Sequence, residues 1–108
     1  MRPSASTLAV VLFLTACAPH EPAEGLATSG LPEEVRADYE VFAQRCSKCH
    51  SLARPLQSGI SDDAYWKEYV ERMRRQPGSG ISPRDEEPIL RFLHYYSLEE
   101  KRRRGGGG

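Results

Sequence analysis

Two cysteines and a histidine form the clearest chemical pattern in this sequence of 108 residues. Cys46 and Cys49 are separated by two residues, and His50 follows at once. Thiols at this spacing can add to the two vinyl groups of a haem, and the adjacent imidazole can then bind its iron. The pattern therefore predicts one covalently bound haem c, attached through Cys46 and Cys49, with His50 as an axial ligand.

Other uses of a Cys-x-x-Cys pair fit the sequence less well. A zinc site needs a second pair of ligands, and the only other histidines are His20 and His94. A thioredoxin-like redox pair would lie beside a βαβ pattern, and the sequence predicts no strand. Haem attachment is the interpretation that the residues favour.

The second axial ligand decides what a haem iron can do. The chain has two methionines, Met1 and Met73, and Met1 belongs to a segment that we expect to be removed. Met73 is then the sole thioether candidate, and we expect it to bind the iron. A helical methionine more often fills a gap in a core. His94 is the rival ligand, and an iron without a sixth ligand is the third alternative.

The first residues have the pattern of an export signal. A positively charged start precedes an apolar run at residues 8–14, which is too short to span a bilayer as a helix. Small residues then precede Cys17, which resembles the lipobox of bacterial lipoproteins. We expect residues 1–16 to be a lipoprotein-type signal peptide and Cys17 to carry the lipid. The alternative is an ordinary signal peptide with a cysteine near its cleavage site by chance.

Composition divides the remaining chain into three parts. Residues 17–31 are rich in Pro, Gly and small side chains, which predicts a flexible linker. Residues 32–100 form the predicted domain, a size at which a hydrophobic core alone is marginal and a buried haem would enlarge it. Residues 101–108, four cations and four glycines, are predicted to be a disordered tail. Its basic run is either solvated or in contact with anionic lipid.

The overall charge gives no case for a nucleic acid partner. The chain has 15 basic and 15 acidic side chains, a formal net charge of zero. A balanced composition also gives no case for strong long-range electrostatic steering.

Three helical segments can be predicted, with no convincing strand. The first covers about residues 32–46, and the second covers about residues 61–76, ending before a Pro-Gly pair. The third starts at Ser82, a plausible N-cap followed by proline. Pro88 predicts a kink or an irregular first turn there. The apolar positions of these segments recur at helical spacing: Val35, Tyr39 and Phe42; Trp66, Tyr69, Val70 and Met73; Ile89, Leu90, Phe92, Leu93 and Tyr96.

Residues 32–98 resemble the class I c-type cytochromes. The residues that carry the resemblance are the motif at 46–50, Phe42 four positions before its first cysteine, Met73, and an apolar C-terminal helix. The resemblance implies a small all-α, cytochrome c-like fold, with three main helices around one covalently bound haem. It also implies that the first and last helices cross with an aromatic at their contact. Two features depart from the family: Asp38 stands where glycine is often found, and Met73 lies on a helix rather than clearly in a loop.

The resemblance also suggests which side chains surround the haem. A proline carbonyl accepts the Nδ1 proton of the ligating histidine in that family, and Pro55 is the nearest candidate. Such a bond would orient the His50 ring. Trp66 would either hydrogen-bond a haem propionate or pack in the core. Arg54 would either pair with a propionate or remain solvated.

The predicted function is one-electron transfer by a non-enzymatic monohaem cytochrome. The protein would be tethered by lipid to a bacterial envelope membrane, face the periplasm, and exchange electrons with redox partner proteins. Ala18 in place of aspartate is consistent with sorting to the outer membrane. Two alternatives remain open: a haem-based sensor or ligand-binding protein with an open sixth position, and a haem subunit of an oxidoreductase complex.

Overall fold

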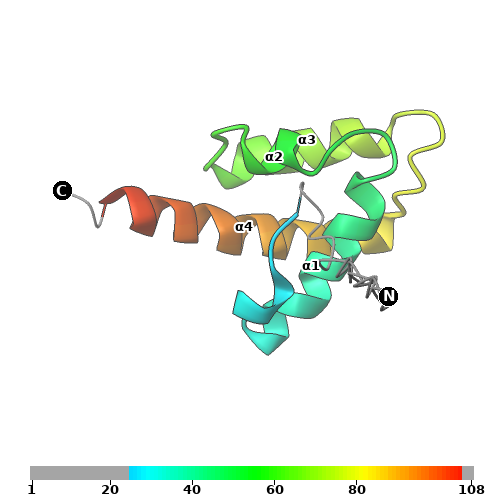
Figure 1. The fold of residues 1–108 in the computed structure, drawn as a ribbon. Coiled ribbons are helices and arrows are strands. Elements are labelled where there is room, and N and C mark those ends of the chain that lie inside the picture. The colour runs from blue at the N-terminus through cyan, green and yellow to red at the C-terminus, as the bar shows by residue number, and fades with distance from the viewer. Residues whose placement is uncertain (1–24, 106–108) are drawn as a thin grey trace, which may run out of the picture.

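The computed structural model describes residues 25–105, and this part of the chain is helical without any strand. The predicted all-α class is therefore confirmed. A 3-10 turn, η1 (Thr28–Gly30), is followed by α1 (Glu33–Cys46), α2 (Ala53–Leu56), α3 (Asp63–Arg74) and α4 (Pro83–Gly105) (Figure 1). The predicted signal peptide, Cys17 and His20 lie outside the described residues.

Local side-chain chemistry explains where α3 and α4 begin. The Asp62 carboxylate accepts hydrogen bonds from the backbone of Ala64 at 2.8 Å and Tyr65 at 3.2 Å, which caps α3. The Asp85 carboxylate accepts the backbone N–H of Ser82 at 2.8 Å. This bond is the reciprocal half of a capping box, and it fixes the start of α4 at the predicted position.

Helix α4 is the element on which the other long helices pack. Both α1 and α3 contact it, with α1 crossing its N-terminal half and α3 running alongside (Figure 1). Phe42 of α1 and Phe92 of α4 are fully buried, with ring centroids 4.7 Å apart. Tyr39 adds an edge-on contact to Phe92 at 5.1 Å. The aromatic contact expected between the first and last helices is present.

The predicted disordered tail starts too early. Helix α4 continues to Gly105, so residues 101–105 are helical. Arg102 pairs with Glu99 at 3.0 Å and Arg103 with Glu100 at 3.2 Å, each one helical turn apart. Such pairs stabilise a helix, and cations in a last turn interact favourably with its dipole. Disorder was predicted from the composition of residues 101–108 alone, which does not describe how their cations pair with glutamates one helical turn earlier.

The predicted linker also overlaps the folded domain. The Leu26 backbone N–H donates to the Tyr39 hydroxyl at 2.8 Å, and Leu26 and Leu31 pack against the core. Residues 25–31 therefore belong to the domain. The short α2 was not predicted, whereas Pro88 lies inside α4 and does not end it.

Within residues 25–105, none of the helices combines the length and apolar character needed to cross a membrane.

Candidate haem-binding site

A cavity of about 320 Å³ lies between the C-terminal ends of α1 and α3. Its walls also include the segment that leads into α2 and the loop after α3. The lining residues are Arg45, Cys46, Cys49, His50, Arg54, Met73, Gln76, Pro77, Ser79 and Ile81. Both cysteines, the histidine and the methionine singled out in the sequence therefore face one space, whose volume lies within the range of ligand sites.

The two cysteines differ in exposure. Cys46 is the last residue of α1 and is partly buried, whereas Cys49 is exposed in the following turn, and both are free thiols. Burial raises the pKa of Cys46 to about 12. Its thiol therefore stays protonated at neutral pH, and Cys49 is the more accessible sulfur.

His50 has a hydrogen-bond arrangement that suits a metal ligand. Its Nδ1 lies 3.0 Å from the carbonyl oxygen of Ser51. When Nδ1 carries the proton and donates it to this oxygen, Nε2 keeps a free lone pair for a metal. The acceptor is not Pro55, as the family resemblance suggested. The Pro55 carbonyl instead accepts a hydrogen bond from the Ser58 hydroxyl at 2.7 Å, and this bond closes the turn after α2.

Of the two rival sixth ligands, only Met73 lies in this cavity. Met73 is the penultimate residue of α3 and is partly buried against the core. His94 lies on α4, where its Nδ1 is 2.9 Å from the Asp63 carboxylate. His94 is exposed and lines a different part of the surface. The fold thus brings together Met73 and His50, which belong to different segments.

Trp66 is a core residue in this structure. It is 1% exposed, and its indole N–H donates to the Ser97 hydroxyl at 2.7 Å, which links α3 to α4. Trp66 does not line the cavity of the cysteines. The geometry matches the packing alternative, because a bond to a propionate would need the N–H that Ser97 already accepts.

Tyr69 is a residue of this region that the sequence interpretation missed. Its side chain is buried, and its hydroxyl has no hydrogen-bond partner among the described residues. Burial raises the pKa of this hydroxyl, the nearby Cys46 raises it further, and Arg54 opposes the shift. A buried unpaired hydroxyl costs about 1–3 kcal/mol, which a polar group of a bound ligand could recover. The signal in the sequence was its position one turn before Met73 on α3.

Two ion pairs tie the cavity walls to the start of α4. Arg45, beside Cys46, lies 3.1 Å from Asp85, and Arg74, beside Met73, lies 3.6 Å from Glu86. A hydrogen bond from the Ser82 backbone, with smaller contributions from Arg45, lowers the pKa of Asp85. The carboxylate is therefore charged at neutral pH, and both walls are anchored to one helix.

The loop after α3 is closed by a serine and two glycines. The buried Ser79 donates to the Arg74 carbonyl at 2.9 Å and accepts the Ile81 backbone N–H at 3.3 Å. Gly78 and Gly80 have φ angles of 74° and 66°, which other residues rarely adopt. Pro77 and Ser79 of this Pro-Gly-Ser-Gly segment line the cavity.

The donor set of the cavity fits a haem. In the described part of the chain, no group of three or more His, Cys, Asp or Glu side chains could hold a bare metal ion. A porphyrin supplies four equatorial nitrogens itself, so the protein needs to provide only axial ligands. His50 and Met73 can do this, and Cys46 and Cys49 can form the thioethers.

The chain matches no protein-family model, no curated protein and no solved structure.

A second, more open groove of about 940 Å³ lies between α1, α3 and α4. It contains none of the cysteines, nor His50 or Met73. Its lining residues are Glu34, Val35, Asp38, Asp63, Trp66, Lys67, Pro83, Glu86, Glu87, Leu90, Arg91 and His94. This groove is therefore separate from the candidate haem site.

Proposed function

We propose that this protein is a monohaem c-type cytochrome that transfers single electrons. Cys46 and Cys49 would hold one haem c covalently, and His50 and Met73 would bind its iron. The observation that carries the proposal is the shared cavity: Cys46, Cys49 and His50, at and after the end of α1, line the same space as Met73 of α3.

The side chains of this chain suit electron transfer rather than bond-making chemistry. A bound haem supplies the one-electron couple of its iron, and a methionine opposite a histidine raises the potential of that couple. Met73 lies at the end of a packed helix, and Arg45 and Arg74 anchor both cavity walls to α4. Such support keeps the ligands in place in both oxidation states, so little reorganisation accompanies each transfer.

A small cytochrome c-like fold is part of the same proposal. Its support is the crossing of α1 and α4 around Phe42 and Phe92, with the motif directly after α1 and Met73 at the end of α3. The sequence supports an envelope location. Cys17 would carry a lipid, and the domain would face the periplasm and exchange electrons with redox partner proteins.

Intact mass and optical spectra test the proposal. The chain is expressed with export and c-type haem maturation, and the mature protein is purified. We expect the added mass of one haem and one lipid, and a weak far-red sulfur-to-iron band in the ferric spectrum. The double variant Cys46→Ala/Cys49→Ala is the control and should carry the lipid without haem.

The result also separates the two alternatives. A haem protein that lacks the far-red band and binds carbon monoxide rapidly when ferrous is a sensor or ligand-binding protein. Stable co-purification with a larger oxidoreductase identifies a subunit of a complex. A mature protein of unmodified mass contradicts haem attachment altogether.

A further inference from the structure

The open groove between α1, α3 and α4 continues along α4. It meets a smaller hollow of about 250 Å³, which lies between the start of α3 and the second half of α4. Asp63 and His94 line both spaces, and their side chains are 2.9 Å apart. The smaller hollow adds Leu98 and Lys101. One side of α4, which we call the α4 face, is therefore lined by open space from Pro83 to Lys101.

The groove end of the α4 face is acidic. Its lining includes five carboxylates and two cations, Lys67 and Arg91, so its net charge is negative. Asp38 and Glu87 both pair with Arg91, at 2.8 Å and 2.9 Å, and so share a single positive charge. Glu34 has no ion pair among the described residues. The Glu87 side chain is 82% exposed, so it can meet a cation of another molecule.

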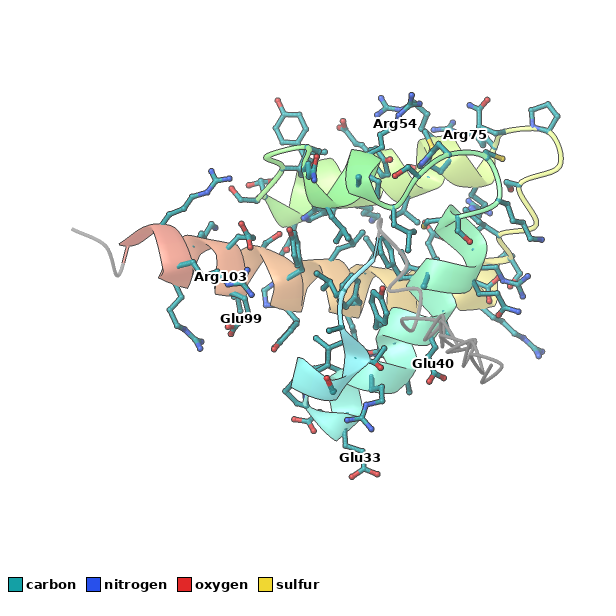
Figure 2. The ribbon with its side chains drawn as sticks, viewed as in Figure 1. Glu33, Glu40, Arg54, Arg75, Glu99 and Arg103 are labelled. Carbon is teal, nitrogen blue, oxygen red and sulfur yellow. The ribbon has the colours of Figure 1, made fainter. Side chains whose placement is uncertain are left out.

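The other end of the α4 face is basic. Residues 101–104 are four successive cations in the last turns of α4. Arg102 and Arg103 pair with glutamates one turn earlier, whereas Lys101 has no ion pair in the part of the chain that the structure describes. These turns are exposed and extend past α1 and α3 (Figure 1). Figure 2 shows Arg103 toward this end, well apart from Glu40 of α1.

The residues of the α4 face are spaced symmetrically about His94. Leu90 and Leu98 lie four positions to either side of it. Glu87 and Lys101 lie seven positions to either side, or about two helical turns, so all five residues share one side of the helix. Leu90 is partly buried in the groove, and Leu98 is 46% exposed. A second α4 laid antiparallel over His94 therefore brings leucine to leucine and each glutamate to a lysine.

We propose that the α4 face binds the same face of a second copy of this chain, in an antiparallel two-fold dimer. Leu98 of each copy enters the groove of the other and covers Leu90, and Glu87 faces Lys101 of the partner subunit. A single exposed leucine means little by itself. Here it lies between acidic and basic ends that complement each other only in reverse orientation. A two-fold contact uses one surface twice and closes at two copies, so both ends are paired in each copy.

The dimer goes beyond the proposed electron transfer and does not depend on a haem. None of the residues of the α4 face lines the cavity of Cys46, Cys49 and His50. The dimer contact and the candidate haem site are therefore separate surfaces. A second copy is favoured over an unrelated basic protein because this chain itself carries the complementary end at the matching spacing.

Zero-length crosslinking tests the register of the two helices. A carbodiimide joins a lysine amine to a carboxylate only when the two groups are in contact, and mass spectrometry identifies the joined peptides. Glu87 and Lys101 are 14 residues apart on one helix, a separation of about 21 Å, so a single chain cannot join them. We expect a Glu87–Lys101 crosslink between two copies. The full mature protein is used in excess mild detergent, so that two lipid anchors do not share one micelle.

Charge reversal tests the same contact through the size of the protein. Sedimentation velocity from about 1 μM to about 1 mM covers weak and moderate affinities. Glu87→Lys and Lys101→Glu each place like charges at both contacts of a two-fold dimer, and we expect each to weaken dimerisation at least about tenfold. A mixture of these two variants restores opposite charges at both contacts, as does the double variant Glu87→Lys/Lys101→Glu. Both should dimerise like the wild-type protein.

The matched controls reverse charges outside the α4 face. Glu68→Lys changes an exposed glutamate of α3 that lines neither the groove nor the smaller hollow. Arg103→Glu changes a cation about 200° around α4 from Lys101. Both controls should dimerise like the wild-type protein. Leu98→Gln should weaken dimerisation while far-UV circular dichroism keeps its helical signal, because Leu98 is exposed in the single copy.

Three results would overturn the proposal. The first is a wild-type protein that stays monomeric at about 1 mM. The second is equal weakening by the test variants and the controls, which would show that net charge alone governs association. The third is association that continues past two copies without the Glu87–Lys101 crosslink, which would indicate an open chain of copies instead of a closed dimer.

Discussion

Arg91 of α4 binds Asp38 of α1 through both carboxylate oxygens, with Nε 2.9 Å from Oδ2 and Nη2 2.8 Å from Oδ1. The pair bridges the two helices beside the contact of Phe42 and Phe92. In the class I cytochromes, which the sequence resembles, glycine is often found at this contact between the first and last helices. The structure explains this departure, because the carboxylate at the helix contact has a bidentate partner on the facing helix.

Replacing Asp38 with asparagine is expected to lower the midpoint of thermal unfolding modestly. The substitution removes the charge and one strong acceptor, while Arg91 keeps its pair with Glu87 at 2.9 Å. The loss should shrink as salt is added, because Arg91 is exposed. A double-mutant cycle with Arg91→Gln measures the coupling. Additive effects of the two substitutions would show that the pair contributes nothing across the helix contact.

Replacing Phe42 with alanine is expected to cost about 3–5 kcal/mol of unfolding free energy. The Phe42 ring is fully buried and contacts both Phe92 and Tyr39. A loss of this size is comparable with the stability of so small a domain. Urea unfolding of the haem-loaded protein measures it, with Leu98→Ala as the control because Leu98 is exposed. Similar losses in the two variants would contradict the packing described for α1 and α4.

Replacing Met73 with leucine is expected to remove the far-red band and lower the reduction potential. Leucine fills similar space but provides no sulfur, so the fold should survive. Axial ligation is a main determinant of potentials that span about 0.8 V, and we expect a shift on the order of 0.1 V or more. Redox titration followed by absorbance measures it. An unchanged band and potential would mean that another residue binds the iron. The companion variant His94→Ala tests the rival ligand.

Replacing Tyr69 with phenylalanine is expected to shift the potential of the haem-loaded protein while leaving the sulfur band in place. The Tyr69 hydroxyl is buried, lacks a partner in the described residues, and lies near Cys46 and Arg54, which line the cavity. We therefore expect a polar group of the haem to accept its proton. A hydrogen bond of about 0.5–1.5 kcal/mol that forms in only one oxidation state sets an upper limit on the order of 20–60 mV for one electron. Tyr65→Phe is the control, because Tyr65 is exposed. Equal potentials in the two variants would assign Tyr69 to packing alone.

The buried Cys46 thiol is expected to make the stability of the haem-free chain fall at alkaline pH. The pKa of Cys46 is raised by burial from 9.0 to about 12 in the folded state. Above pH 9 the unfolded chain releases this proton while the folded chain retains it, so stability falls as pH rises through that window. The slope is at most about 1.4 kcal/mol per pH unit. Denaturant unfolding between pH 8 and 11 measures it.

The matched control for this pH dependence is the haem-loaded protein. A thioether at Cys46 has no proton to lose, so its stability should not carry this component. Thiol alkylation of the haem-free chain offers a second measurement, in which the exposed Cys49 should react before Cys46. Faster reaction at Cys46 would contradict the burial described here.

The sequence predicted the local features of this protein well, because each depends on neighbouring residues. The spacing of Cys46, Cys49 and His50 also depends only on neighbouring residues, and the haem that it indicates stays a prediction. The Pro-Gly pair at 77–78 and the capping residues Asp62 and Ser82 predicted where α3 ends and where α3 and α4 begin. Local signals misled at residues 101–105, where composition suggested disorder and i,i+3 ion pairs support a helix.

Only the tertiary structure decided which distant residues meet. It placed Met73 in the cavity of His50 and His94 beside Asp63, a choice that spacing along the chain could not make. In the structure the Trp66 N–H donates to Ser97, and the Tyr69 hydroxyl has no partner among the described residues. The sequence could not predict either result, because hydrogen bonds between helices depend on how the helices pack.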